Sequence, residues 1–148
     1  EIASKEWSFG MKNLIERKGY LLKTNPREGI SSDFIKNENN EKDFKIYEEL
    51  FNLANQINIK ENSFNEEKMI DILKESANIS KKNKVQTKHI IELEAYLKSN
   101  GAEYCKQLGA GGGGFLFCLF KSDSPNIPDD LRDNILTPKI NEEGIKIF

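Results

Sequence analysis

The stretch LGAGGGGFLFCLF, residues 108–120, places a run of glycines directly against a run of apolar residues. A plain turn between two elements needs only one or two residues that can adopt positive φ. Ordering a glycine costs roughly 0.5 to 1 kcal/mol more than ordering an alanine, so the five glycines forfeit about 2 to 5 kcal/mol unless something else requires them. This cost favours a functional loop over a turn without a role.

The residues on either side of the glycines predict two strands. FLFCLF, 115–120, is short, continuously apolar and bounded by turn residues, which indicates a strand covered on both faces. AEYCKQL, 102–108, is compatible with a second strand, so the glycine loop joins the two. Further on, we expect a short helix in IPDDLRDNIL with Pro128 in its first turn, and a last strand through Ile145, Ile147 and Phe148.

Apolar residues at helical spacing predict four helices before residue 101. The first ends at Gly19, and the second begins near Asp43. The third opens with Ser63 and Glu66 in the spacing of a capping box, and the fourth, 87–99, ends at Asn100 and Gly101. The residues expected on their buried faces are Trp7, Met11, Leu14 and Ile15; Phe44, Tyr47, Leu50, Phe51, Ala54 and Ile57; Met69, Ile70, Leu73 and Ala77; and Ile90, Ile91, Leu93, Ala95 and Leu97. The segment between the first two helices reads as a polar loop.

Composition indicates one domain, and the order of the expected helices and strands indicates the α+β class, with helices on one face of a small, mainly antiparallel sheet. The chain has 148 residues, 37% of them hydrophobic, and 22 basic against 24 acidic residues. The formal net charge of -2 gives no reason to expect nucleic acid or an anionic membrane as a partner. We find no membrane-spanning stretch and no secretory leader, and therefore expect a soluble cytoplasmic protein. Because residue 1 is Glu rather than Met, we expect a fragment of a longer chain.

Other residues that can carry chemistry are better explained as structural. Cys105 and Cys118 are too few for a disulfide framework or a four-ligand metal site, and we interpret them as small core residues rather than a redox pair. His89 is interpreted as a surface position on a helix, since no nucleophile lies near it in sequence. Adjacent acidic residues point apart and are interpreted as solvated charge; they are Glu48-Glu49, Glu66-Glu67, Asp129-Asp130 and Glu142-Glu143. No metal site and no catalytic residue are predicted in this chain.

Two established phosphate motifs do not fit the loop. GAGGGG satisfies the G-x-G-x-x-G pattern, but a dinucleotide fingerprint opens a helix and this loop opens a strand. A P-loop is excluded because Phe115 stands where its lysine would be. Two readings stay open: a cradle of backbone N–H groups around an anion or substrate, and a flexible hairpin that contacts nothing. Lys81, Lys82 and Lys84 would meet a substrate phosphate only if their segment faces the cleft.

The stretch GAEYCKQLGAGGGGFLFCLFK, residues 101–121, resembles the third motif of the GHMP small-molecule kinases. Its context adds to the resemblance: a helix ending in Asn-Gly-Ala, a strand containing Lys106, then Leu-Gly-Ala and four glycines leading into an aromatic strand. Within that superfamily the stretch is most similar to heptose-7-phosphate kinase-like sugar kinases. Residues 1–40 resemble nothing in it.

The resemblance implies a two-domain, ATP-dependent kinase acting on a sugar or sugar phosphate. It assigns residues 41–148 to the ferredoxin-like, two-layer C-terminal domain and leaves an N-terminal helix and polar loop, 1–40, unassigned. It carries over one site, the ATP and substrate-phosphate loop Gly109, Ala110, Gly111, Gly112, Gly113 and Gly114. ATP and Mg²⁺ would be held mainly by an N-terminal ATP-binding domain, the expected partner, which would also supply the catalytic residue. The alternative is a non-catalytic binding or dimerisation module of the same fold; the sequence predicts no oligomeric state.

Overall fold

The computed structural model describes residues 2–24, 40–60, 62–82, 86–108 and 114–140. The elements, in chain order, are α1 (Ile2–Lys18), β1 (Gly19–Lys23), α3 (Asn40–Ala54), α4 (Glu66–Ser80), α5 (Lys88–Ser99), β2 (Ala102–Gln107), β3 (Phe115–Phe120), the 3-10 helix η1 (Asp129–Asn134) and β4 (Ile135–Leu136). Most of the predicted polar loop between the first two helices and the predicted last strand through Phe148 lie outside these residues. The predicted short helix after Pro128 is confirmed as η1, with Pro128 at its N-cap.

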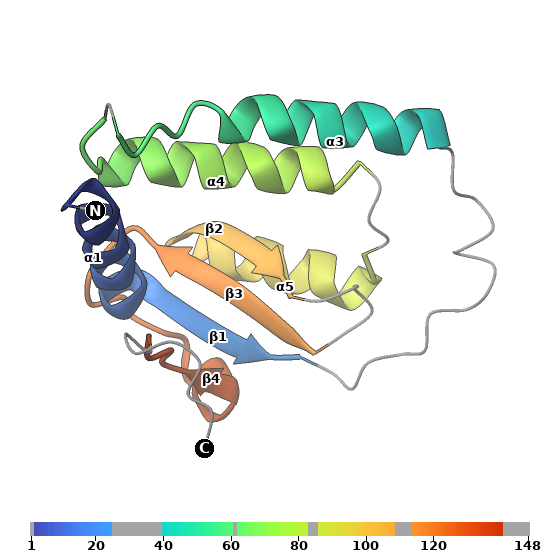
Figure 1. Cartoon of the computed structure of the whole chain (residues 1–148). Helices are drawn as coiled ribbons and strands as arrows, with labels where there is room; N and C mark the ends of the chain where they lie inside the picture. The colour runs from blue at the N-terminus through green and yellow to red at the C-terminus, as the bar shows by residue number, and fades with distance from the viewer. Residues whose placement is uncertain (1, 25–39, 61, 83–85, 109–113, 141–148) are drawn as a thin grey trace, which may run out of the picture.

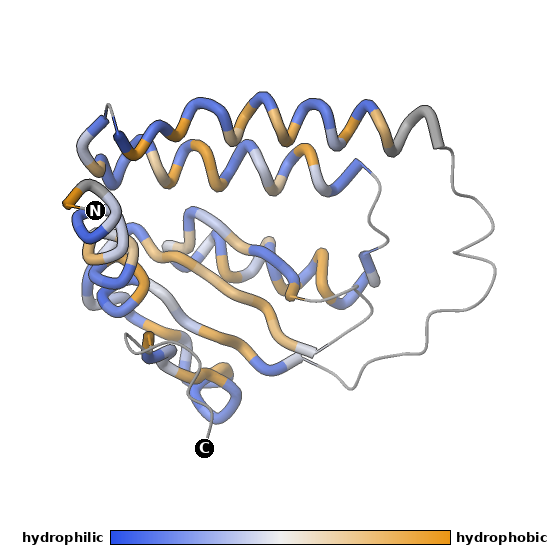
Figure 2. Tube along the Cα trace, viewed as in Figure 1, coloured by the Kyte–Doolittle hydropathy of each residue, from blue (hydrophilic) through white to orange (hydrophobic). Residues whose placement is uncertain are grey.

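The four strands form one antiparallel sheet in the order β2-β3-β1-β4. β3 lies between β2 and β1, with Cys118 opposite Cys105 on one side and Tyr20 on the other. Side chains of β3 alternate between the two faces, and most of them are buried. Figure 2 shows β3 as a largely hydrophobic segment in the middle of the fold, as FLFCLF predicts.

Helices cover both faces of this sheet. On one face Leu97 of α5 packs into a buried cluster with residues from three strands, and Leu131 of η1 adds to it. On the other face Leu14 of α1 and Ile70 of α4 pack against Tyr104 and Leu119. Figure 1 shows α3 as the outermost helix, lying on α4 and away from the sheet. The α+β class with a small antiparallel sheet is confirmed, whereas the prediction of helices on one face only is wrong.

The sequence did not predict strand β1, nor the two-residue strand β4, whose residues Ile135 and Leu136 were expected in the short helix. Strand β1 follows α1 without a loop, because Gly19 allows a turn that another residue would obstruct: a Cβ there would lie 2.5 Å from the backbone oxygen of Ile15. The five residues GYLLK carry too little alternation to reveal a strand. This segment is a strand because it pairs with both β3 and β4, and both partners are distant from it in the sequence.

The buried face of α3 differs from the prediction. Phe44, Tyr47 and Phe51 are 71%, 63% and 66% exposed, and the buried residues that pack against α4 are instead Ile46 and Leu53. The predicted Leu50 and Ile57 also pack against this cluster. Both sets recur at helical spacing, so the period alone cannot choose between them. Ile72 and Ile79 of α4 decide the choice, because they offer an aliphatic surface to the second set.

The ends of α4 and α5 can be compared with the capping residues that the sequence predicts. Helix α4 begins at Glu66 because the side chain of Asn65 accepts a hydrogen bond from the N–H of Lys68 at 2.9 Å, so the predicted Ser63 capping box is wrong. Helix α5 is capped by Thr87 and ends at Asn100, before Gly101 with φ +103, as predicted. Its predicted buried face is right for three residues and wrong for the exposed Ile91 and Ala95. Among the helices in the described ranges, none has the length and apolar character needed to cross a bilayer.

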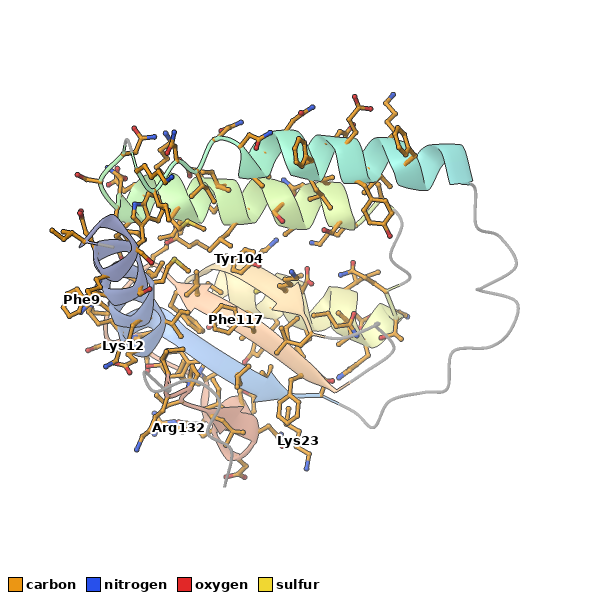
Figure 3. The ribbon with its side chains drawn as sticks, viewed as in Figure 1. Phe9, Lys12, Lys23, Tyr104, Phe117 and Arg132 are labelled. Carbon is orange, nitrogen blue, oxygen red and sulfur yellow. The ribbon has the colours of Figure 1, made fainter. Side chains whose placement is uncertain are left out.

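The buried phenol of Tyr104 predicts a loss of stability at alkaline pH. Figure 3 labels Tyr104 with Phe117, on the side of the sheet that faces α1 and α4. Burial, and next the interaction with Cys105, raise the pKa of Tyr104 to about 12. Between pH 10 and 12 the unfolded chain therefore loses this proton while the folded chain keeps it, so the free energy of unfolding falls by up to about 2 to 3 kcal/mol.

Urea unfolding at pH 9 to 12 checks this prediction. Tyr104→Phe should remove this part of the alkaline fall, and Tyr47→Phe, at an exposed position on α3, should leave it unchanged. Parallel curves for the wild type and Tyr104→Phe would contradict it.

Candidate functional site

The glycine loop begins where β2 ends and returns where β3 starts. The N–H of Leu108 donates to the carbonyl of Phe115 at 2.9 Å, which continues the β2-β3 ladder up to the loop itself. Figure 1 shows the end of β1, the end of α4 and the start of α5 at the same end of the molecule, which we call the loop end. Of the predicted site, Gly109, Ala110 and residues 111–113 lie outside the described residues, and Gly114 lies within them.

Thr24, directly after β1, anchors the exit of the loop. Its backbone N–H and its Oγ1 both donate to the carbonyl oxygen of Gly114, each at 2.8 Å. Gly114 has φ +98, and a Cβ there would have no atom within 4 Å. The backbone conformation, not lack of space, therefore favours glycine at this position. The end of β1 and the start of β3 thus meet at the last residue of the loop.

Removing the Thr24 hydroxyl should loosen this anchor. Thr24→Val keeps the shape and the backbone N–H but loses the Oγ1 hydrogen bond, so we expect the free energy of unfolding to fall by about 1 kcal/mol. Amide exchange at Phe115 should become faster. Thr24→Ser keeps a hydroxyl and should behave nearly as the wild type; an equal loss in both variants would show that the hydrogen bond is not the cause.

A buried polar cluster lies beside β2 at the loop end. Glu94 of α5 is 5% exposed, and its carboxylate accepts hydrogen bonds from Lys81 Nζ at 2.8 Å and from Gln86 Nε2 at 3.1 Å. The cluster borders a cavity of about 20 Å³ that Ser80 and Gln107 also line, which is room for about one water molecule. This cluster ties the start of α5 to the end of α4 and has no space for a substrate.

The lysines considered for substrate phosphate have other partners. Lys81 pairs with Glu94, and Lys82 pairs with Glu49 of α3 at 2.8 Å. Lys84 lies outside the described residues. The two described ammonium groups thus neutralise carboxylates of this domain, which weighs against a role for them with phosphate.

The other residues that can carry chemistry are the two cysteines, His89 and the acidic pairs. Cys105 and Cys118 are buried and not disulfide-bonded, and the hydrogen bond between their side chains, together with burial, raises the pKa of Cys118. His89 is exposed on α5. The acidic pairs include members engaged in surface interactions, namely Glu66 with Arg17 and Lys18, Asp129 with Arg132, and Asp130 with Tyr96; the pair at 142–143 is outside the described residues. In the described ranges, no three His, Cys, Asp or Glu side chains form a group that could hold a metal ion.

Sequence reasoning missed Thr24 and Glu94. Glu94 had a signal, because it stands four residues after Ile90 and three before Leu97 on the buried face of α5, and a carboxylate at such a position needs a partner. Thr24 had none, since its role depends on a carbonyl 90 residues away.

The chain folds as a small α+β domain with an antiparallel sheet. At the loop end, a glycine loop joins two neighbouring strands, and its last residue is hydrogen-bonded to the residue that follows a third strand. A family model described as "GHMP kinases C terminal" matches residues 58–135, which is more than half of the chain and includes the glycine loop. The chain therefore belongs to the GHMP kinase C-terminal family, as the resemblance predicted. Searches of curated proteins and of solved structures returned no significant match.

Proposed function

We propose that this chain acts as the C-terminal part of an ATP-dependent kinase that phosphorylates a sugar or a sugar phosphate. The family match over residues 58–135 carries the proposal, because it spans the loop and the elements around it. The anchoring of Gly114 by Thr24 supports a loop whose exit is held in one place. A held loop can present its backbone N–H groups to a ligand without first paying the entropy of ordering.

The proposed role of the loop is positioning. Phosphoryl transfer depends mainly on alignment and on stabilising the charge of the transferred group, and glycines let the backbone approach that group closely. We assign ATP, Mg²⁺ and the catalytic acidic residue to an N-terminal ATP-binding domain.

The sequence encoded upstream of Glu1 tests the proposal first. If the chain is part of a GHMP kinase, this upstream sequence should contain a phosphate loop of the form Pro-x-x-x-Gly-Leu-Gly-Ser-Ser-Ala. The extended protein should then release ADP with a member of a panel of sugars and sugar phosphates. Gly114→Val, which forces a β-branched residue to positive φ, should lower kcat/KM by about tenfold or more. An extended protein without ATP turnover on the panel would contradict the proposal.

The 148-residue chain by itself supplies a second test. We expect no phosphorylation of any panel compound and an ATP Kd of about 1 mM or weaker, since most nucleotide contacts are assigned elsewhere. Calorimetry and a coupled ADP assay measure both. Robust turnover by this chain alone would overturn the division of labour.

The alternative function is a non-catalytic binding or dimerisation module. The exposed aromatic side chains Phe44, Tyr47 and Phe51 of α3 favour it, because exposed apolar patches often mark interaction sites. A reading frame that starts at or near Glu1 would support the module over the kinase.

A further inference from the structure

A second and larger cavity lies beside Thr24, on the side of the sheet that α5 and η1 cover. Its volume is about 220 Å³. The end of β1, the first turns of α5, and η1 all contribute to its wall; the lining residues are Leu22, Lys23, Thr24, His89, Leu93, Leu131 and Asn134. Figure 3 shows Lys23 at the end of β1, on the side where η1 lies.

The wall of this cavity has an apolar part and a polar part. Leu22, Leu93 and Leu131 belong to the hydrophobic cluster under α5 and give it an apolar floor. Lys23, His89 and Asn134 are polar and largely exposed. A concave site with an apolar surface and a few converging polar groups is the usual form of a small-molecule site.

Apart from Thr24, the polar side chains of the wall have no partners in the described part of the chain. Lys23 and His89 make no hydrogen bond or ion pair there, and none of the described residues that line the cavity carries a carboxylate. Nearby lysines differ: Lys81 is paired with Glu94, and Lys88, next to His89, lies 3.7 Å from Glu92. Among the described residues these donors therefore have no acceptor, and an anion is the ligand that complements them.

We propose that this cavity binds a small organic phosphate, with Lys23, His89 and Asn134 contacting the phosphate and the three leucines contacting the carbon skeleton. Phosphate suits the wall because it offers several acceptor oxygens to donors that come from three different elements. The cavity volume limits the size of the ligand. Sites for drug-sized molecules measure roughly 300 to 1,000 Å³. The cavity volume of about 220 Å³ therefore suits a small organic phosphate and is too small for a nucleotide. The proposal goes beyond the positioning role of the glycine loop and does not depend on ATP.

Titration of the 148-residue chain in phosphate-free buffer tests the site, with NMR of its methyl and imidazole signals and calorimetry. The probes are inorganic phosphate, glucose 6-phosphate and acetate. We expect saturable shifts at Leu22, Leu93 and His89 with both phosphates, tighter binding of glucose 6-phosphate, and little response to acetate. Equal affinity for acetate, or shifts absent from these residues, would overturn the assignment.

Matched variants separate the site from general charge attraction. Lys23→Gln and His89→Gln should each weaken glucose 6-phosphate about tenfold, the usual size of a lost hydrogen bond to a charged group. Lys88→Gln, beside His89 but outside the cavity wall, and Lys45→Gln on the distant α3 should change the affinity less than about twofold. An equal loss in the controls would refute the site. Because all four side chains are exposed, each variant is expected to fold, which circular dichroism checks.

Separate measurements of ATP use and of phosphate binding distinguish failure of this proposal from failure of the proposed kinase function. Both are made on the wild type, because Gly114→Val would also disturb Thr24, which holds the Gly114 carbonyl and lines the cavity. Loss of ATP use in the wild type with phosphate binding retained would count against the kinase alone. Absence of phosphate binding with kinase activity retained would count against the cavity alone.

Discussion

Leu22→Ala is expected to lower the free energy of unfolding by about 3 to 4 kcal/mol, the largest effect we predict. Leu22 is 1% exposed and lies on β1, between β3 and β4. Its side chain packs in the cluster that joins the sheet to α5. Truncation removes buried methyl groups and leaves a cavity that strands paired on both sides cannot close.

Leu136→Ala is the matched control for this substitution. Leu136 lies on β4, opposite Leu21 of β1, and is 53% exposed, so its truncation should cost less than about 1 kcal/mol. Urea unfolding followed by circular dichroism measures both variants. β1 precedes the family match over 58–135, so a large effect at Leu22 would show that this segment belongs to the same cooperative unit. Equal costs at the two leucines would contradict the central place of β1.

Glu94→Ala is expected to lower the free energy of unfolding by about 2 to 3 kcal/mol at neutral pH, the second largest effect of a substitution on stability. The substitution removes two hydrogen bonds, one of them to the charged Lys81, and leaves the Gln86 amide without its acceptor. Lys81 is partly exposed and can turn to water, which limits the loss. Glu94→Gln keeps the shape and should cost less than Glu94→Ala.

Glu92→Ala on the same helix is the control. Glu92 is exposed, and its pairing with Lys88 at 3.7 Å is a surface contact, so the change should cost less than about 0.5 kcal/mol. Thermal or urea unfolding of the three variants compares them directly. Equal effects of Glu94→Ala and Glu92→Ala would show that the buried cluster does not stabilise the loop end.

The candidate site was predictable to different degrees. The glycine loop between two strands is visible in the sequence because glycine and continuous aromatic residues are strong local signals. Glu94 was visible only as a charge on an apolar face, and its partners were not. The cavity beside Thr24 combines β1, α5 and η1, so no window of the sequence contains it.

By itself the sequence determined the α+β class, the glycine loop and its flanking strands, the ends of α5 and the family. Each of these depends on residues close together in the chain, whose conformational preferences act locally. Only the tertiary structure decided that helices cover both faces of the sheet, that GYLLK forms a strand and that α3 buries its aliphatic face. These features depend on contacts with segments that are distant in the sequence. In α3, for example, Ile46 and Leu53 are buried because they pack against Ile72 and Ile79 of α4, whereas the aromatic residues of the helix are exposed.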